Sequence, residues 1–396
     1  MAKKSDLITF RERTIRIMPK IKIVKNKDEL CGMKQDWSVL HSKSKSNSPF
    51  STWEWISNYE KILMGSHEEL NIICIFNEGE KLIAVAPFMI KKERRYGLEF
   101  NIIELIGSDG RIAADYMDII IDPEYLDEGK RLLMNYLTGG TNSKWDAIRW
   151  SGILDDSKCW DLLRQLKNEG YEAVEEPMDI CPYITLPKTW EEYLDTLSKK
   201  SRYNVRKKRR DLEKEHKNTL FFIVSDEDSL VKAMEWTCQL HRSRMVMKGI
   251  KGFSTSSEFW EFQKEVAKEF LAKGWLFLGV LEVDGSPVAS QYGFKFNNKL
   301  FHYQTGFDPN YDKYSAGLVS TGFMIENALK EKVQEYDFLR GKEDYKFHWT
   351  QDVRTIYSAL IANKNFGGRL YFRAEKTLKR LKTKLRMLLD RPTEIK

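Results

Sequence analysis

Residues 301–317 read FHYQTGFDPNYDKYSAG and join a β-type run, an Asp-Pro turn and a helix start made of small residues. The same plan occurs earlier in the chain, because residues 121–125 (IDPEY) resemble residues 307–311 (FDPNY). Each motif precedes a helical pattern, EGKRLLMNYL in the first case and GLVSTGFMIENAL in the second. The repetition indicates that one structural unit occurs twice.

Further landmarks recur in the same order. The tripeptide Phe-Ser-Thr stands at residues 50–52 and 253–255, and each copy opens a Trp-bearing helical stretch. Two β-type runs joined by a glycine-containing turn follow each stretch, which is the pattern of a hairpin. Strands are then expected from Trp145 to Gly152 and from Tyr336 to Gly341. The landmarks lie 186 to 203 residues apart, whereas solenoid repeats are about 20–50 residues long, so the pattern predicts a duplicated domain.

The landmarks divide the chain into three parts. We expect one unit over residues 20–185 and a second over 186–365, separated by the proline-bracketed segment CPYITLP at 181–187. Strands mixed with helices and hairpins predict an α+β fold, in which each unit is a twisted mixed sheet flanked by helices. Residues 366–396 form a separate tail. Its apolar residues recur at four- and three-residue steps opposite Lys and Arg, which predicts a basic amphipathic helix: Leu370, Ala374, Leu378, Leu381, Leu385 and Leu388.

Composition excludes several classes of protein. The chain has 396 residues, 42% hydrophobic and 31% charged, which is typical of a globular protein and not of a disordered one. The five cysteines are scattered, so neither a disulfide framework nor a zinc site is expected. The first 20 residues lack an apolar signal-peptide core and no run of apolar residues is long enough to span a bilayer. We therefore expect a cytoplasmic protein.

The net charge of +7 is unevenly distributed. Residues 1–27 hold nine Lys or Arg against two Asp or Glu, and residues 199–217 and 369–396 each hold ten against three. Each segment is thus +7, which leaves the rest of the chain at −14. A mildly acidic body with basic patches fits local capture of phosphates or an anionic surface better than general nucleic-acid binding. Solvated helix faces are the alternative interpretation of each patch.

Common catalytic motifs are absent from the sequence: it has no GxGxxG after a strand, no GxxxxGK[ST], no HExxH and no GxSxG. The six histidines form no ligand pair at helical spacing, so we expect no metal. The helix start at Ser315, Ala316 and Gly317 is a better candidate site. Open N–H groups and the helix dipole at such a terminus suit a diphosphate, and Lys313 adds a charge. Simple capping of the helix by Ser315 is the alternative.

Two further segments carry candidate side chains. The run YDFLRGKEDYKFHW at 336–349 is more polar than the end of a core strand requires, and its alternative interpretation is an ion-paired surface turn. His241 and Arg244 lie three residues apart, so they share one face of a predicted helix that borders either a cleft or solvent. The basic run at 199–212, which includes Arg206, suits a polyanion without proving one.

Four segments together carry a family resemblance: KKSRYNVRKKRRDLE from 199, HRSRMVMKG from 241, GFDPNYDKYSAG from 306 and YDFLRGKEDYKFHW from 336. They resemble the GNAT acyltransferase superfamily, and more narrowly the CelD-like acetyltransferases of polysaccharide biosynthesis, which are relatives of the FemABX peptidyltransferases. The resemblance covers the second unit, and the first unit follows as the degenerate twin of a tandem GNAT protein. The sequence departs from the usual Ser-Pro-Gly by carrying Ala316 in the middle position.

The resemblance implies a site between two splayed central strands of the second unit. Acyl-CoA would be the co-substrate, with its pyrophosphate on the backbone near Lys313, Ser315, Ala316 and Gly317. Tyr345, Lys346 and Trp349 resemble the Phe-Lys-x-x-Phe element of the FemABX proteins, so Lys346 is expected to stabilise the oxyanion. Asp337 or His241 is the expected general base for an acceptor amine. The remaining expected substrate-binding residues are Arg244, Tyr345, Arg340 and Arg206.

The expected function is therefore transfer of an acyl group to an amine of a sugar, a sugar nucleotide or another cell-envelope precursor. One alternative keeps the fold but takes aminoacyl-tRNA as donor, with the patch at 199–210 on the tRNA phosphates. The other is a non-catalytic assembly factor for polysaccharide synthesis whose tail, residues 369–396, lies on an anionic membrane surface at the inner face of the membrane. No sequence-specific nucleic-acid partner is expected.

Overall fold

A computed structural model describes residues 19–44, 46, 48–95, 97–139, 144–249 and 252–389. The basic segment at 1–27 and the tail at 366–396 each lie partly outside the described residues. The first half contains these elements: β1 (Lys20–Val24), α1 (Lys27–Cys31), α2 (Lys34–Lys43), η1 (Pro49–Ser51), α3 (Trp53–Ile62), β2 (Glu68–Leu70), β3 (Ile72–Phe76), β4 (Leu82–Ala86), β5 (Phe88–Arg95), β6 (Leu98–Leu105), β7 (Ile120–Ile121), η2 (Pro123–Tyr125), α4 (Leu126–Thr138), β8 (Ala147–Ile153), α5 (Lys158–Asn168) and β9 (Ala173–Thr185).

The second half and the tail contain the remaining elements: α6 (Trp190–Thr196), α7 (Lys199–Glu215), β10 (Thr219–Ile223), α8 (Glu227–Met247), η3 (Phe253–Thr255), α9 (Ser257–Ala272), β11 (Leu276–Val283), β12 (Ser286–Phe296), β13 (Lys299–Phe307), η4 (Pro309–Tyr314), α10 (Ala316–Lys330), β14 (Glu335–Asp337), η5 (Lys346–His348), β15 (Val353–Ala362) and α11 (Phe366–Leu389). The predicted α+β fold of helices and mixed sheets is confirmed. The strand expected over 336–341 is shorter, because β14 ends at Asp337 and Leu339 has a left-handed backbone with φ +55°.

The paired landmarks form matching local structures because they carry the same capping chemistry. The Asp122 side chain accepts a hydrogen bond from the Glu124 N–H at 3.1 Å, and Asp308 accepts one from Asn310 at 2.9 Å. Each aspartate thereby closes a 3₁₀ turn that leads into a helix, α4 or α10. Thr52 and Ser256 cap α3 and α9, and each side chain accepts a hydrogen bond from the backbone N–H three residues later.

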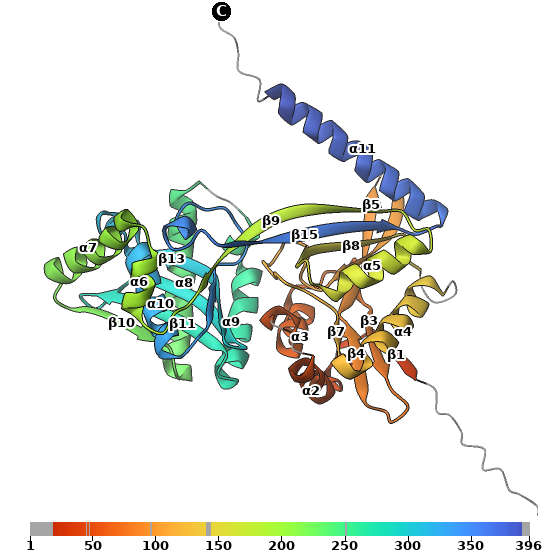
Figure 1. Ribbon diagram of the computed structural model, residues 1–396, viewed down its shortest axis with the longest axis horizontal. Coiled ribbons are helices and arrows are strands. Elements are labelled where there is room, and N and C mark those ends of the chain that lie inside the picture. Colours follow the sequence, from red (N-terminus) through yellow and green to blue (C-terminus); the bar gives the residue numbers. More distant parts are fainter. Residues whose placement is uncertain are drawn as a thin grey trace, which may run out of the picture.

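The two halves exchange their last strands. Eleven strands form one sheet in the order β10-β11-β12-β13-β14-β9-β15-β8-β6-β5-β2, and a second sheet has the order β1-β3-β4-β7. Strand β9 from the first half pairs with β14 of the second, whereas β15 from the second half pairs with β8 of the first. The long pair β9 and β15 bridges the halves (Figure 1). The division into units at residue 185 stays a prediction, and this sheet runs across it.

Below the bridge the halves pack through their Trp-bearing helices, α3 and α9 (Figure 1). The Trp55 ring meets the Phe262 ring edge-on at 5.0 Å between centroids. At the rim, the Asn58 amide donates to Glu269 at 3.2 Å and Lys61 pairs with Glu265 at 2.6 Å. The hydrophobic core is therefore continuous between the halves.

The tail helix α11 packs against the body through its first turns, and ion pairs follow farther along, between Arg95 and Glu375 and between Lys379 and Glu176. Tyr371 and Phe372 are buried, and the Tyr371 ring packs against Phe100 of β6. Further along, Leu381 is 52% exposed, and the helix projects away from the body (Figure 1). Among the described residues, no helix has the length and apolar character needed to cross a membrane.

Candidate functional site

Two central strands of the second half part from each other. Strand β13 runs parallel to β14 but pairs with it at only three positions, the last being Phe301 opposite Asp337. Beyond Phe301, β13 continues to Phe307 without β14. The other edge of β13 carries a bulge at Tyr303, because Tyr292 of β12 faces Gln304 while Gly293 faces His302. A bulge beside the opening redirects neighbouring side chains, as is common near active sites.

Helix α10 begins beside the end of β13. Ser315 has a left-handed backbone (φ +54°) and its side chain makes no capping hydrogen bond, so the structure does not show the alternative of capping by Ser315. The N–H groups of Ala316 and Gly317 belong to the first turn, which has no acceptor within the helix. A Cβ atom on Gly317 would lie 3.3 Å from the Phe307 ring, so glycine keeps this approach open. The tip thus has the backbone geometry that binds phosphate.

Two lysine side chains lie near the tip of α10. Lys313 is 66% exposed at its side chain and pairs with Glu215 at 3.1 Å, instead of lying over the first turn. Lys208 of α7 donates to the Lys313 backbone oxygen at 2.5 Å and so brings a second ammonium group to this surface. The sequence predicts Lys313 beside the tip, whereas Lys208 is predicted only as one member of the basic run at 199–212.

Asp337 ends β14 and is fully buried. The Tyr116 hydroxyl donates to its two carboxylate oxygens at 3.1 and 2.9 Å, and the Leu339 N–H donates at 2.7 Å. Arg354 lies 3.7 Å away. Burial raises the pKa of Asp337 to about 6, although Arg354 and the hydrogen bonds act in the opposite direction. A carboxylate with such a pKa is suited to accept a proton near neutral pH.

Lys346 is buried, with 3% of its side chain exposed. Its ammonium group donates to the backbone oxygens of Leu339 at 3.1 Å and Arg340 at 2.6 Å, and pairs with Glu343 at 3.0 Å. The lysine therefore holds the turn that follows Asp337. Because Glu343 is about half exposed, it is the partner most easily exchanged for a ligand oxygen.

Arg340 joins the two halves at this site. Its guanidinium and its backbone N–H both bind Asp115 of the first half, the latter at 3.0 Å. Asp115 is completely buried, and burial raises its pKa against the effect of Arg340. Asp115 and Tyr116 lie in the segment between β6 and β7, so the first half supplies part of the site in the second.

Arg244 and Tyr345 lie beside Thr305, in the part of β13 that β14 does not pair with. The Arg244 guanidinium donates to the Thr305 backbone oxygen at 3.1 Å and lies 5.8 Å from the Tyr345 ring centre. His241, on the same helix, is 2% exposed and packs against Trp260. Burial and Arg244 lower the pKa of His241 to about 4, so it is neutral at pH 7. These surroundings make Asp337 the better candidate base.

Arg206 lies apart from this cluster. It pairs with Glu191 and is 53% exposed at its side chain. It belongs to an outward stripe of α7 that borders a shallow groove of about 360 Å³, formed by Lys199, Arg202, Tyr203, Arg206, Lys207 and Arg210. The structure thus brings together Lys346, Asp337, Arg340, Arg244 and Tyr345, and leaves Arg206 on a separate surface.

A buried chain of hydrogen bonds links the splayed strands to α10. The Tyr336 hydroxyl contacts His302 Nδ1 at 3.1 Å, and His302 Nε2 contacts the Thr305 hydroxyl at 2.6 Å. Thr305 donates to Gln291 Oε1 at 3.0 Å, and Gln291 Nε2 donates to Ser320 at 2.5 Å. Because the Thr305 proton is used toward Gln291, His302 must donate from Nε2 and accept at Nδ1. Burial lowers the pKa of His302 to about 3, which agrees with a neutral ring.

Sequence reasoning missed several members of the site: Asp115, Tyr116, Lys208, Gln291, Thr305 and Arg354. Asp115 and Tyr116 precede Asp337 by more than 200 residues and stand in no motif, so no local signal identifies them. Within the described part of the chain, no group of three or more His, Cys, Asp or Glu is arranged to hold a metal ion.

Comparisons with known proteins agree with this geometry. Residues 199–347 match the family model described as Acetyltransferase (GNAT) domain, whereas a comparison with curated protein sequences finds no match. The fold is similar to the crystal structure of FemX, with a TM-score of 0.58 and 10% identity over 83% of this chain and 95% of that one. It is also similar to the C-terminal domain (DUF2156) of a putative lysylphosphatidylglycerol synthetase from Agrobacterium fabrum, with a TM-score of 0.51 and 11% identity over 87% and 96% of the chains. These identities show a shared fold. The predicted GNAT-type domain in the second half is confirmed, and the narrower CelD-like resemblance stays a prediction.

Proposed function

We propose that this protein is an acyltransferase that moves an acyl group from acyl-CoA to an amine of a sugar, a sugar nucleotide or another cell-envelope precursor. The observation that carries the proposal is the parting of β13 and β14 beside the first turn of α10, inside the segment that matches the GNAT model. The turn offers backbone N–H groups to a pyrophosphate, with Lys208 and Lys313 nearby.

Direct transfer needs no nucleophilic side chain. The amine nitrogen attacks the thioester carbonyl carbon, a C–N bond forms, and the C–S bond breaks to release the thiolate of CoA, which then takes up the proton that the amine has lost. Asp337 is the proposed acceptor of the amine proton, because its pKa of about 6 leaves it ionised at pH 7 yet basic enough to take a proton. The Tyr116 hydroxyl already donates to both carboxylate oxygens of Asp337. Tyr116 is therefore a candidate to relay the proton to Asp337.

Lys346 is the proposed source of positive charge for the developing oxyanion. It would contact that oxygen by exchanging its bond to Glu343, while Leu339 and Arg340 keep it in place. Arg244 and Tyr345 border the opening and are proposed to position the acceptor.

The test measures CoA binding by calorimetry and acylation of a panel of amino sugars and sugar nucleotides by mass spectrometry. Lys346→Met should bind CoA normally but lose about 10²–10³-fold in turnover, as expected for loss of an oxyanion contact. Lys342→Met, an exposed position in the same turn, is the matched control. Failure of the wild-type chain to bind CoA would contradict the proposal.

A second candidate donor, aminoacyl-tRNA, is favoured by one observation. Five cations and the 60% exposed Tyr203 form the outward stripe of α7, which offers charge for phosphates and a ring for stacking. If this donor is used, tRNA binding should weaken steeply with salt and fall in Arg206→Ala. Salt-insensitive binding, or none, would eliminate it.

We also propose that α11 places the protein on an anionic membrane surface at the cytoplasmic face. Residues 369–396 hold ten Lys or Arg against three Asp or Glu, and the described part of the helix exposes Leu381. A non-catalytic assembly factor for polysaccharide synthesis could use α11 to bind the membrane in the same manner. The Lys346→Met comparison separates the two roles, since only a catalyst loses turnover.

A further inference from the structure

The first half contains a cavity of about 1100 Å³ that the proposed acyl-transfer site does not use. It opens where the strands of this half divide between two sheets. The chain passes from β2 to β3 at Asn71 and from β4 to β5 at Pro87, and each step changes sheet. In the second half, β11, β12 and β13 form one continuous ladder. All lining residues lie between positions 23 and 144, so the cavity is a property of the first half.

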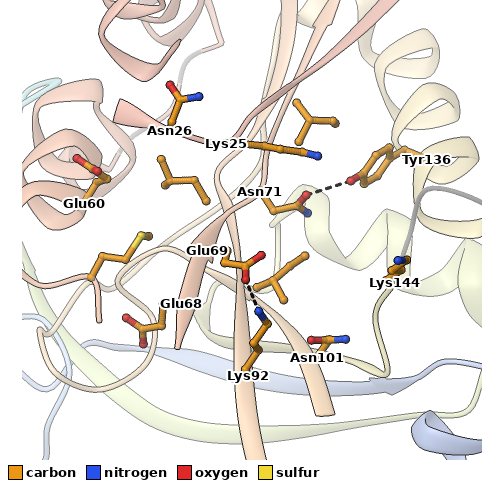
Figure 2. A pocket seen from close by; sticks show the side chains of 14 residues that line it. Lys25, Asn26, Glu60, Glu68, Glu69, Asn71, Lys92, Asn101, Tyr136 and Lys144 are labelled. Atoms are coloured by element: carbon orange, nitrogen blue, oxygen red, sulfur yellow. Dashed lines mark hydrogen bonds and ion pairs between the residues drawn. The ribbon is translucent and has the colours of Figure 1, made fainter. Parts of the chain in front are cut away.

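Uncharged polar groups contribute to the lining of the cavity. Asn71 is 4% exposed, and its Oδ1 accepts a hydrogen bond from the Tyr136 hydroxyl at 3.0 Å (Figure 2). Its NH₂ group has no hydrogen-bond partner among the residues that the structure describes. Asn26 and Asn101 add two more side-chain amides. The amides and the phenol can form hydrogen bonds with the hydroxyls of a sugar. Ile90 adds an apolar surface beside them.

Charged groups lie on opposite sides of the opening. Figure 2 shows Lys25 reaching toward Tyr136, with Lys144 on the same side, and Glu60 on the other. Neither lysine ammonium forms an ion pair within the described ranges, although the Glu29 carboxylate accepts a hydrogen bond from the Lys25 backbone N–H at 2.8 Å and feels the charge of Lys25. One oxygen of Glu60 is buried without a hydrogen-bond partner in the same ranges, and burial raises the pKa of this carboxyl. The remaining acids are neutralised, Glu69 by Lys92 and Glu68 by Arg111.

We propose that this cavity binds a phosphorylated amino sugar, with its phosphate at Lys25 and Lys144, its hydroxyls at Asn71 and Asn101, and its amine toward Glu60. Two ammonium groups on one side match a phosphate as point charges. A carboxylate with an unused oxygen on the other side matches an ammonium group. At about 1100 Å³ the cavity is slightly larger than the usual upper size of small-molecule sites, about 1,000 Å³, and so has room for a phosphorylated sugar. The inference is independent of acyl transfer, because no residue of this cavity belongs to the segment that matches the GNAT model.

Calorimetry on the full chain with glucosamine 6-phosphate tests this site. The probe should bind, and glucosamine or inorganic phosphate alone should bind at least about tenfold more weakly. Lys25→Ala combined with Lys144→Ala should raise the Kd about tenfold or more, whereas CoA binding stays unchanged. Both lysines are exposed, so the variant should fold. The control is Lys232→Ala combined with Lys264→Ala, which removes the same charge from exposed positions of the second half.

Glu60→Gln separates the two ends of the ligand. It should weaken glucosamine 6-phosphate about tenfold but leave glucose 6-phosphate unchanged, because only the first probe carries an amine. Equal loss in the charge control would overturn the proposal, since it would indicate nonspecific attraction. Lack of binding of the phosphorylated probe at millimolar concentration would overturn it as well. Either outcome leaves the CoA measurement, and hence the proposed acyl transfer, standing by itself.

Discussion

Burial of Asp337 ties the stability of the fold to pH. Its pKa rises from 3.8 to about 6, so between these values the folded chain keeps a proton that the unfolded chain has lost. The group therefore stabilises the folded state below pH 3.8, and this contribution is lost as the pH rises through 6. Compared with Asp337→Asn, the wild type should lose about 3 kcal/mol of unfolding free energy across this window.

Urea unfolding of the two proteins at a series of pH values measures this difference. Asp344→Asn, at an exposed position seven residues later, should run parallel to the wild type. A constant difference between wild type and Asp337→Asn would show that the pKa of Asp337 is the same in the folded and the unfolded chain. A wild type that gains stability relative to Asp337→Asn as the pH rises would show that Arg354 outweighs the burial of Asp337.

Gln291 is the central member of the buried chain between β13 and α10. It accepts from Thr305 and donates to Ser320, and the Ser320 hydroxyl donates to the Gly317 backbone oxygen in the first turn of α10. Gln291→Leu should lower the unfolding free energy by about 1–3 kcal/mol for each polar group left unpaired. Ser320→Ala added to Gln291→Leu should cost less than the sum of the single changes, because both break one chain. Strict additivity in chemical denaturation would contradict a connected network.

The sequence predicts best those helices and turns whose first residues carry a capping side chain. Asp122 and Asp308 close the same turn because both precede a proline and accept from a nearby N–H. The length of β14 could not be predicted from such a local signal. Apolar residues continue to Leu339, but hydrogen bonds from Leu339 and Arg340 to buried aspartates bend the chain after Asp337. Tertiary contacts therefore decide where this strand ends, and with it where β13 becomes free.

The tail helix α11 offers a prediction about membranes. Leu381→Glu should reduce binding to vesicles of anionic phosphatidylglycerol about tenfold, because it removes one exposed apolar contact and adds a negative charge. Binding to neutral phosphatidylcholine should be weak for all variants. Leu220→Glu, another exposed leucine 55% accessible on β10, is the control in co-sedimentation. Unchanged binding to the anionic vesicles would contradict a membrane contact through this face of α11.

The arrangement of the two halves depends on contacts between residues that are far apart in the sequence. The repeated landmarks predict two similar units, yet β9 and β15 cross between them, and the pairs Asp115–Arg340 and Tyr116–Asp337 join residues more than 200 positions apart. Similar units are equally compatible with two separate sheets. The sequence alone could therefore indicate the plan of each half and the α10 tip, but not the exchange of strands that completes the site.

This exchange predicts that the second half does not form the site alone. A fragment of residues 186–396 contains the whole GNAT-matching segment but lacks β9, which lies between β14 and β15 in the sheet. It also lacks Asp115 and Tyr116, so Arg340 loses its carboxylate partner, the buried Asp337 loses the Tyr116 hydroxyl, and Phe262 loses Trp55. We expect the fragment to give a poorly dispersed NMR spectrum and no CoA binding, and co-expression with residues 1–185 to restore both. A fragment that folds and binds CoA alone would show that β14 and the α10 tip are held within the second half.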